Sequence, residues 1–390
     1  MIRRFTSLSI LLPALGLGGL MGCATTWDIA TYPVRGVTDY AASKVKHYLF
    51  NPGKVIDDAR SLRDGFLNVV RLLQGDAEKQ WGEGDTPTSG TRRVVKYTDR
   101  YKTRALVAFT QKRITVETVV QENVNDHLIR GLADALLTPE DPRAVDLYSD
   151  APIHDGGKPF LHGLVLDHRS RPITTRTQAL AFAQEMVVAR SGTRKNANGK
   201  RVHFVQVPMV ARVTKAQVAR YKPLVVKNAD EFQLEPSLIF AIMETESAFN
   251  PYAVSRAPAF GLMQLVPTTG GRDAYRLVER RDGIPSQDEL FTPARNIRLG
   301  SAYLHILNTR YLAGIRHPTS RLYCVISAYN GGAGNVLNTF SRDRREAVRI
   351  INGMSPSQVK THLLNRHPRA ESRRYLAKVL QKRPKYAGAI

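Results

Sequence analysis

The chain has 390 residues, of which 43% are hydrophobic and 23% are charged. This composition is typical of globular proteins and excludes a disordered or collagen-like chain, and the length excludes a single small module. Lys and Arg number 57 against 34 Asp and Glu, and the net charge of +23 indicates an anionic partner: nucleic acid, an anionic membrane or a carboxylate-rich polymer. Two cysteines, Cys23 and Cys324, are too few for a disulfide framework.

The N-terminus has the features of an export signal. Arg3 and Arg4 precede an almost wholly apolar stretch over residues 8–20, which is shorter than the roughly 20 apolar residues that span a bilayer. The quartet Leu20-Met21-Gly22-Cys23 resembles the bacterial lipobox, in which the cysteine is acylated after cleavage. We therefore predict a lipoprotein signal peptide over residues 1–22 and a lipid anchor on Cys23.

The residue after Cys23 bears on the compartment. By resemblance to other lipoproteins, Ala24 rather than an acidic residue implies the periplasmic face of an outer membrane. Export argues against nucleic acid as the anionic partner. The alternatives are an ordinary secreted protein with a chance cysteine at the cleavage site, and twin-arginine export directed by Arg3 and Arg4.

Hydrophobic patterning predicts a mainly α chain of three mature parts: a tether over residues 23–60, an α+β domain over 61–215 and a helical domain over 216–390. In the α+β domain, residues 80–92 form a predicted loop and three scattered histidines (His154, His162, His168) do not have metal-site spacing. The predicted regular elements are a weak alternation over 93–98, two paired strands over 106–109 and 114–119, a helix over 125–137 and strands over 160–166 and 202–207.

The helical domain contains a predicted helix that starts at Pro236 and ends before Asn250-Pro251. Two of its residues are glutamates, Glu244 and Glu246. At 100° per residue they lie about 200° apart, so they do not share one substrate. Glu246 lies among apolar residues at helical spacing, and burial together with the helix C-terminus raises the pKa of a carboxyl group.

A carboxyl group that is still protonated near neutral pH is suited to general acid cleavage of a glycosidic bond. The alternative for Glu246 is a structural glutamate paired with an arginine. The surrounding motifs decide between these interpretations. They are Glu246-Ser247-Ala248-Phe249-Asn250-Pro251, Ala253-Val254-Ser255, Gly261-Leu262-Met263-Gln264-Leu265, the 290–304 stretch with Asn296 and Tyr303, Ala328-Tyr329-Asn330-Gly331-Gly332, and Glu371-Ser372-Arg373-Arg374-Tyr375-Leu376.

This ordered set, over about residues 220–385, resembles the lytic transglycosylase family, whose catalytic domain is goose-lysozyme-like and all-α. The resemblance implies that Glu246 is the acid and later the base, and that the sugar chain is bound by Ser255, Met263, Gln264, Tyr329, Asn330, Tyr303 and Tyr375. Packing is the alternative for Met263, Tyr303, Tyr329 and Tyr375, and a turn is the alternative for Asn330. For Asn296 the two interpretations are lining of the glycan cleft and packing. Pro258 stands where the family usually has a glycine, so we expect a local loop shape that differs from that of the family.

The resemblance implies cleavage of the MurNAc-GlcNAc bond of peptidoglycan without water. The muramyl primary hydroxyl attacks its own anomeric carbon, so no second carboxylate, cofactor or metal is needed. Glycan strands that carry peptide carboxylates suit the positive chain, and the membrane is contacted through Cys23. Two alternatives stay open: a lysozyme-type hydrolase on the same fold, and a non-catalytic peptidoglycan-binding lipoprotein.

Overall fold

The structure is a computed structural model that describes residues 55–154, 156–257 and 259–388, and their side chains from residue 64 onward. The predicted signal peptide, Cys23, the tether up to residue 54 and Pro258 lie outside the described residues. No helix in the described ranges is both long enough and apolar enough to cross a bilayer.

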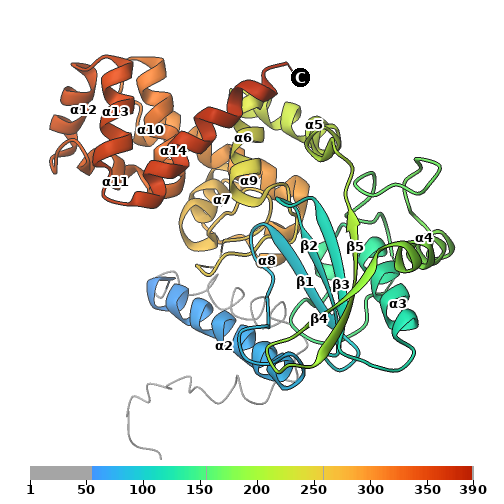
Figure 1. The fold of residues 1–390 in the computed structure, drawn as a ribbon. Coiled ribbons are helices and arrows are strands. Elements are labelled where there is room, and N and C mark those ends of the chain that lie inside the picture. The colour runs from blue at the N-terminus through green and yellow to red at the C-terminus, as the bar shows by residue number, and fades with distance from the viewer. Residues whose placement is uncertain (1–54, 155, 258, 389–390) are drawn as a thin grey trace, which may run out of the picture. The chain divides into compact units, whose positions relative to one another are not determined.

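The first part of the described chain, here called the α+β region, is built on one antiparallel sheet of five strands in the order β1-β2-β3-β5-β4 (Figure 1). Its elements are α2 (Val55–Trp81), β1 (Arg93–Thr98), β2 (Thr103–Ala108), β3 (Arg113–Thr118), α3 (Val124–Leu137), α4 (Arg176–Arg190), β4 (Ser191–Lys195) and β5 (Arg201–Pro208). The first three strands form a meander, whereas β5 pairs with β3 after the chain has formed both helices and β4.

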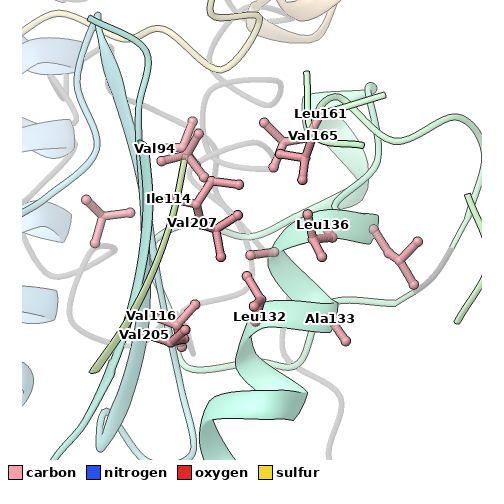
Figure 2. Close-up of a cluster of buried hydrophobic side chains, with 14 of the residues drawn as sticks. Val94, Ile114, Val116, Leu132, Ala133, Leu136, Leu161, Val165, Val205 and Val207 are labelled. Atoms are coloured by element: carbon pink, nitrogen blue, oxygen red, sulfur yellow. The ribbon is translucent and has the colours of Figure 1, made fainter. Parts of the chain in front are cut away.

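One face of this sheet is covered by α3 and α4. Alternate residues of neighbouring strands point toward the helices, as Figure 2 shows for Ile114 and Val116 on β3 and their partners Val207 and Val205 on β5. These four side chains are at most 1% exposed and pack against Leu132 and Leu136 of α3. The period of two along each strand therefore places one apolar face in a core.

The predicted strands and the predicted helix of this region are mostly confirmed. The helix over 125–137 corresponds to α3 and the strand over 202–207 to β5, and three strands occupy residues 93–118 where two paired strands were expected. The prediction of a strand over 160–166 is wrong, because these residues form turns with isolated bridges. Phe160, Leu161, Leu164 and Val165 are nevertheless buried in the core, so an apolar run was mistaken for a ladder strand.

Helices α2 and α4 and strand β4 were not predicted. Strand β4 is Ser-Gly-Thr-Arg-Lys with an exposed-intermediate alternation, and it has no apolar residue that would mark it as a strand. Its place is determined by pairing with β5 at the sheet edge. Helix α4 starts with a capping box in which Thr175 and Gln178 satisfy each other's backbone donors.

The rest of the described chain, here called the helical region, contains helices and no strand. Its helices are α5 (Val213–Phe232), α6 (Pro236–Ser247), α7 (Arg272–Glu279), α8 (Gln287–Phe291), α9 (Pro293–Ile306), α10 (Pro318–Gly331), α11 (Ala333–Asn338), α12 (Arg344–Asn352), α13 (Pro356–Arg366) and α14 (Ala370–Lys382). Helix α6 is the central one: Ile239, Ile242 and Met243 are 0% exposed and belong to one core with side chains of α10 and α14. An α+β region followed by an all-helical region is the fold class expected from the sequence.

Candidate active site

Glu246 lies in the last turn of α6. The helix starts at Pro236, and proline suits this position because an N–H in the first turn would have no acceptor within the helix. It ends at Ser247 because Ala248 and Phe249 adopt the left-handed conformation, with φ of 51° and 63°. The carboxyl group is therefore carried by a rigid, buried helix and directed by the turn that ends it.

The neighbouring glutamate of α6, Glu244, has a different environment. Its carboxylate accepts a 2.6 Å hydrogen bond from Tyr386 Oη and forms ion pairs with Lys385 and, at 3.7 Å, with Lys382. Burial would raise the pKa of Glu244, but these partners together hold the pKa below its usual value. Glu244 is thus an ionised structural residue, on the side of the helix away from Glu246.

Glu246 is partly buried and, within the described ranges, no cationic group lies within 4.0 Å of its carboxyl oxygens to form an ion pair. Burial raises the pKa of Glu246 to about 7. The Tyr375 hydroxyl and the charge of Arg92 act to lower the pKa, and the charge of Glu371 acts to raise it further. The carboxyl group is half protonated near neutral pH, which is the property that the sequence predicted from its apolar surroundings.

Burial raises the pKa of Tyr329 on α10 and of Tyr375 on α14, and the charge of Glu246 raises the pKa of both phenols further. Both tyrosines therefore lie close to this carboxyl group. The Tyr329 hydroxyl donates a 2.9 Å hydrogen bond to the Met263 carbonyl oxygen. Its ring contacts the ring of Tyr303 at 5.5 Å between centroids. Tyr303 in turn lines a cavity of about 580 Å³. The three tyrosines predicted for the site are therefore brought together with Glu246.

The loop over residues 260–265 is held by the buried side chain of Asn296. Asn296 Nδ2 donates to the carbonyl oxygens of Phe260 and Leu290, each at 2.8 Å, and Oδ1 accepts from the Met263 N–H at 2.8 Å. Of the two possibilities left open for Asn296, the structure supports packing: it is 0% exposed and shapes the loop from behind.

Met263 and Gln264 in this loop differ in how they are placed. The Met263 side chain is 0% exposed and lies so close to Gly300 that a Cβ there would be 2.3 Å from its sulfur. Met263 therefore meets the site through its carbonyl group, at the Tyr329 hydroxyl. Gln264 Nε2 donates to the carbonyl oxygens of Ala253 and Gly261, both at 2.9 Å, while its Oε1 is buried and has no hydrogen-bond partner among the described residues.

Ser255 and Asn330 make contacts of their own. The Ser255 hydroxyl donates to the Ala257 carbonyl oxygen and accepts from the Ala259 N–H at 3.2 Å, so within the described residues it binds its own loop. Asn330 follows Tyr329 on α10, and its Oδ1 accepts a 2.7 Å hydrogen bond from Ser372 on α14. That bond connects the two helices that carry Tyr329 and Tyr375.

Sequence reasoning missed Arg92 and Ser372. Ser372 belongs to the motif that ends in Tyr375-Leu376 and is 1% exposed. The sequence feature that could have indicated it is a serine on the same helix face as these two residues. Arg92 gave no signal, because it is one of many arginines and ends a predicted loop far from Glu246 along the chain.

Comparison with protein families gives two adjacent matches. Residues 58–220 match the N-terminal domain of membrane-bound lytic murein transglycosylase C, and residues 223–352 match the transglycosylase SLT domain. The two matches together cover the α+β region and most of the helical region.

Whole-chain relatives agree with these matches. Over 317 residues the chain is 43% identical to membrane-bound lytic murein transglycosylase C of Sodalis glossinidius, covering 81% of this chain and 88% of the relative. The protein of the same name from Yersinia pestis gives the same identity and coverage. Among solved structures, the 70 kDa soluble lytic transglycosylase of Escherichia coli matches 43% of this chain and 24% of its own, with 25% identity and a TM-score of 0.33.

Proposed function

Because this chain belongs to the membrane-bound lytic murein transglycosylase C family and is a peptidoglycan lytic transglycosylase, we propose that Glu246 performs its reaction alone, first as general acid and then as general base. The observation that carries the proposal is the state of this carboxyl group: it is partly buried, it has no ion-pair partner among the described residues, and its pKa is about 7. Such a group can release a proton and take it back at one pH.

In the first step, protonated Glu246 gives its proton to the oxygen that leaves with GlcNAc, and the bond from this oxygen to the anomeric carbon of MurNAc breaks. In the second step, the Glu246 carboxylate removes the proton of the muramyl 6-hydroxyl, whose oxygen bonds to the same anomeric carbon. The product end is 1,6-anhydroMurNAc, no water is consumed, and Glu246 is protonated again. The attack is intramolecular, so its effective concentration is high without a second carboxylate.

The remaining predicted residues are proposed to hold the sugar chain. This proposal is supported by the proximity of Tyr329 and Tyr375 to the carboxyl group, and by the ring contact of Tyr329 with Tyr303, which lines the cavity of about 580 Å³. Aromatic faces and hydroxyls suit pyranose rings, and cavities of this volume are typical of small-ligand sites. For Ser255, Met263, Gln264 and Asn330 we propose roles at the edge of the same site, through loop carbonyl groups and side-chain amides.

We also propose that the chain is anchored by acyl chains on Cys23 to the periplasmic face of the outer membrane. The relatives are named membrane-bound, and the lipobox-like quartet before Ala24 supplies the anchor. Incorporation of labelled fatty acid by the natural chain and its loss in Cys23→Ser would support this proposal, and labelling of both or neither would contradict it.

The catalytic proposal is tested with the full chain carrying Cys23→Ser and with the same chain carrying Glu246→Gln. Glu244→Gln is the matched control, because it makes the same change on the same helix. On isolated sacculi we expect the parent and the control to release muropeptides lighter by one water than hydrolysis products. The Glu246→Gln chain should lose at least about 100-fold in rate.

Three other results would overturn the proposal. Products with reducing ends would identify a hydrolase. Unchanged release by Glu246→Gln would assign the acid to another residue. Binding of sacculi without release by the parent would leave a non-catalytic protein.

A further inference from the structure

Ending α6 in the left-handed conformation leaves the carbonyl oxygens of its last turn in need of donors. The Ala248 N–H and Lys382 Nζ donate to the Glu244 carbonyl oxygen, at 3.2 Å each. Ser247 Oγ donates to the Met243 carbonyl oxygen at 3.0 Å. The Thr245 carbonyl oxygen, one residue before the candidate acid, receives its hydrogen bond from a different part of the chain.

That donor is Arg92, at the end of the loop that leads into β1 of the α+β region. Arg92 Nη2 donates to the Thr245 carbonyl oxygen at 2.7 Å across 153 positions of sequence. Among the described residues no carboxylate forms an ion pair with Arg92, so its charge is not neutralised by a close partner. A guanidinium group at a helix C-terminus both binds a free carbonyl group and complements the negative end of the helix dipole.

The same loop holds the chain just after α6. Asn250 Nδ2 donates to the carbonyl oxygens of Gly90 and Thr91 at 3.2 and 3.3 Å. Tyr252 Oη donates to the Pro139 carbonyl oxygen at 2.5 Å, and the Tyr252 ring packs on Phe160 at 5.3 Å between centroids. The α+β region therefore contacts the chain both within the last turn of α6 and just after it, and these contacts do not depend on Arg92 alone.

We propose that Arg92 is a positioning residue of the reaction: from the α+β region it caps the last turn of α6 and holds a positive charge beside the carboxylate that forms when Glu246 has given up its proton. This inference rests on the proposed function of Glu246. It assigns the α+β region a part in catalysis, because the helical region by itself lacks this cap.

The charged and titratable groups around Glu246 allow this role to be measured. Helix α14 contributes Tyr375 and Glu371, helix α10 contributes Tyr329, and the α+β region contributes Arg92. Glu371 disfavours the ionised carboxyl group, whereas Arg92 favours it. Removal of the Arg92 charge should therefore raise the pKa of Glu246, and the pH above which the general acid becomes deprotonated should rise with it.

The test uses Arg92→Gln, Arg92→Lys and the control Arg93→Gln in the full chain carrying Cys23→Ser. Arg93 is the next residue, is exposed, and donates to the Thr88 carbonyl oxygen of its own loop at 2.9 Å. Two quantities are measured: kcat/KM for anhydro-product release from sacculi between pH 5 and 9, and the titration of the Glu246 carboxyl carbon by ¹³C NMR, assigned by difference with Glu246→Gln.

We expect Arg92→Gln to lower kcat/KM by about 10- to 100-fold and to move the alkaline limb of the profile upward by about one pH unit. Arg92→Lys keeps the charge and should keep the limb near its original pH, with a smaller loss of rate. Arg93→Gln should change neither quantity. A merely structural role would lower the rate of Arg92→Gln without moving the limb or the carboxyl titration, and that result would overturn the inference.

The two proposals fail in different ways. If the parent chain releases no anhydro product, the proposed function fails, and the carboxyl titration still decides whether Arg92 acts on Glu246. If Arg92→Gln does not fold, Arg92→Lys is compared with Arg93→Lys. An equal rate in these two chains would contradict the capping role, because an ammonium group cannot reproduce the geometry of the guanidinium group.

Discussion

Gly261 and Asn296 occupy adjoining space so tightly that a Cβ on Gly261 would lie 2.5 Å from Asn296 Nδ2 and 2.3 Å from the Leu290 carbonyl oxygen. Gly261 has φ of +73°, a conformation that other residues rarely adopt. The loop with Met263 and Gln264 can therefore wrap closely around the buried Asn296 amide, which donates to Phe260 and Leu290. This contact positions the Met263 carbonyl oxygen, which accepts the hydrogen bond from the Tyr329 hydroxyl.

Gly261→Ala should displace this loop. The new Cβ meets backbone, which cannot move aside as a flexible side chain can, so we expect the free energy of unfolding to fall by about 2 to 4 kcal/mol. The control is Gly84→Ala, where φ is +81° and nothing lies within 4 Å of the added carbon. There only the conformational penalty of about 1 to 2 kcal/mol should appear. Equal losses in urea unfolding of the two variants would refute the packing explanation.

Glu246→Gln should stabilise the protein at alkaline pH. The folded-state pKa of Glu246 is about 7 against a reference of 4.5, so the folded state holds the proton more tightly. The stabilisation that protonated Glu246 gives the folded state is fully present below pH 4.5 and is lost as the pH rises through 7, which amounts to about 3 kcal/mol for the natural residue. The amide introduced by Glu246→Gln has no proton to lose in this range. The variant should therefore gain stability relative to the parent between pH 5 and pH 8.

Glu244→Gln is the control for that experiment, because its effect on stability should have the opposite sign. The pKa of Glu244 is held below its usual value by Lys385, Tyr386 and Lys382, despite burial. Its ionised form is stabilising above the unfolded pKa, and that contribution is lost as the pH falls. Substitution should therefore lower the stability at pH 8. Urea unfolding at both pH values measures both signs, and a difference between parent and Glu246→Gln that does not change with pH would contradict the prediction.

Tyr329→Phe should lower activity more than stability. The variant loses the 2.9 Å hydrogen bond to the Met263 carbonyl oxygen, at about 1 kcal/mol of unfolding free energy. Because the hydroxyl also lies beside Glu246, we expect kcat on sacculi to fall by about 10- to 100-fold. Tyr323→Phe on the same helix is the control, since the Tyr323 hydroxyl makes no hydrogen bond within the described residues. If both variants had similar rates, Tyr329 would have no role beyond packing.

Arg104→Ala should destabilise the α+β region strongly. Arg104 is 2% exposed, donates to Glu117 at 2.7 Å and to Asp85 at 2.7 Å, and lies 3.7 Å from the centre of the Trp81 ring. Removing it leaves these two carboxylates with Arg194 as their one ion-pair partner in the described part of the chain, and breaking a buried pair costs about 3 to 5 kcal/mol. Arg143→Ala, which breaks a pair with side chains 48% and 44% exposed, should cost at most about 1 kcal/mol. Thermal unfolding that ranks the two variants equally would contradict this ordering.

The helix that carries Glu246 could be predicted from neighbouring residues, whereas the strands that depend on the pairing of β3 with β5 could not. The residues that start α6, end it and form its apolar face all lie within about a dozen neighbouring positions, so local rules were sufficient to predict this helix. By contrast, the low-polarity run 160–166 has the composition of a strand but is buried as turns, and β4 has the composition of a loop but pairs with β5. Composition alone could not separate these cases, because β4 is a strand through its hairpin with β5, the next strand along the chain, and β5 itself is held in the sheet by pairing with the distant strand β3.

Residues at helical spacing were sufficient to identify the candidate acid, because the burial of its carboxyl group follows from them, and ordered motifs were sufficient to identify the family. The folded chain was needed to show that Asn296 shapes the loop from behind, that Met263 meets the site through its carbonyl group, and that Arg92 reaches the end of α6. These contacts join side chains to backbone groups across as many as 153 positions. A backbone carbonyl group is present in every residue, so no sequence pattern marks which one will be the partner.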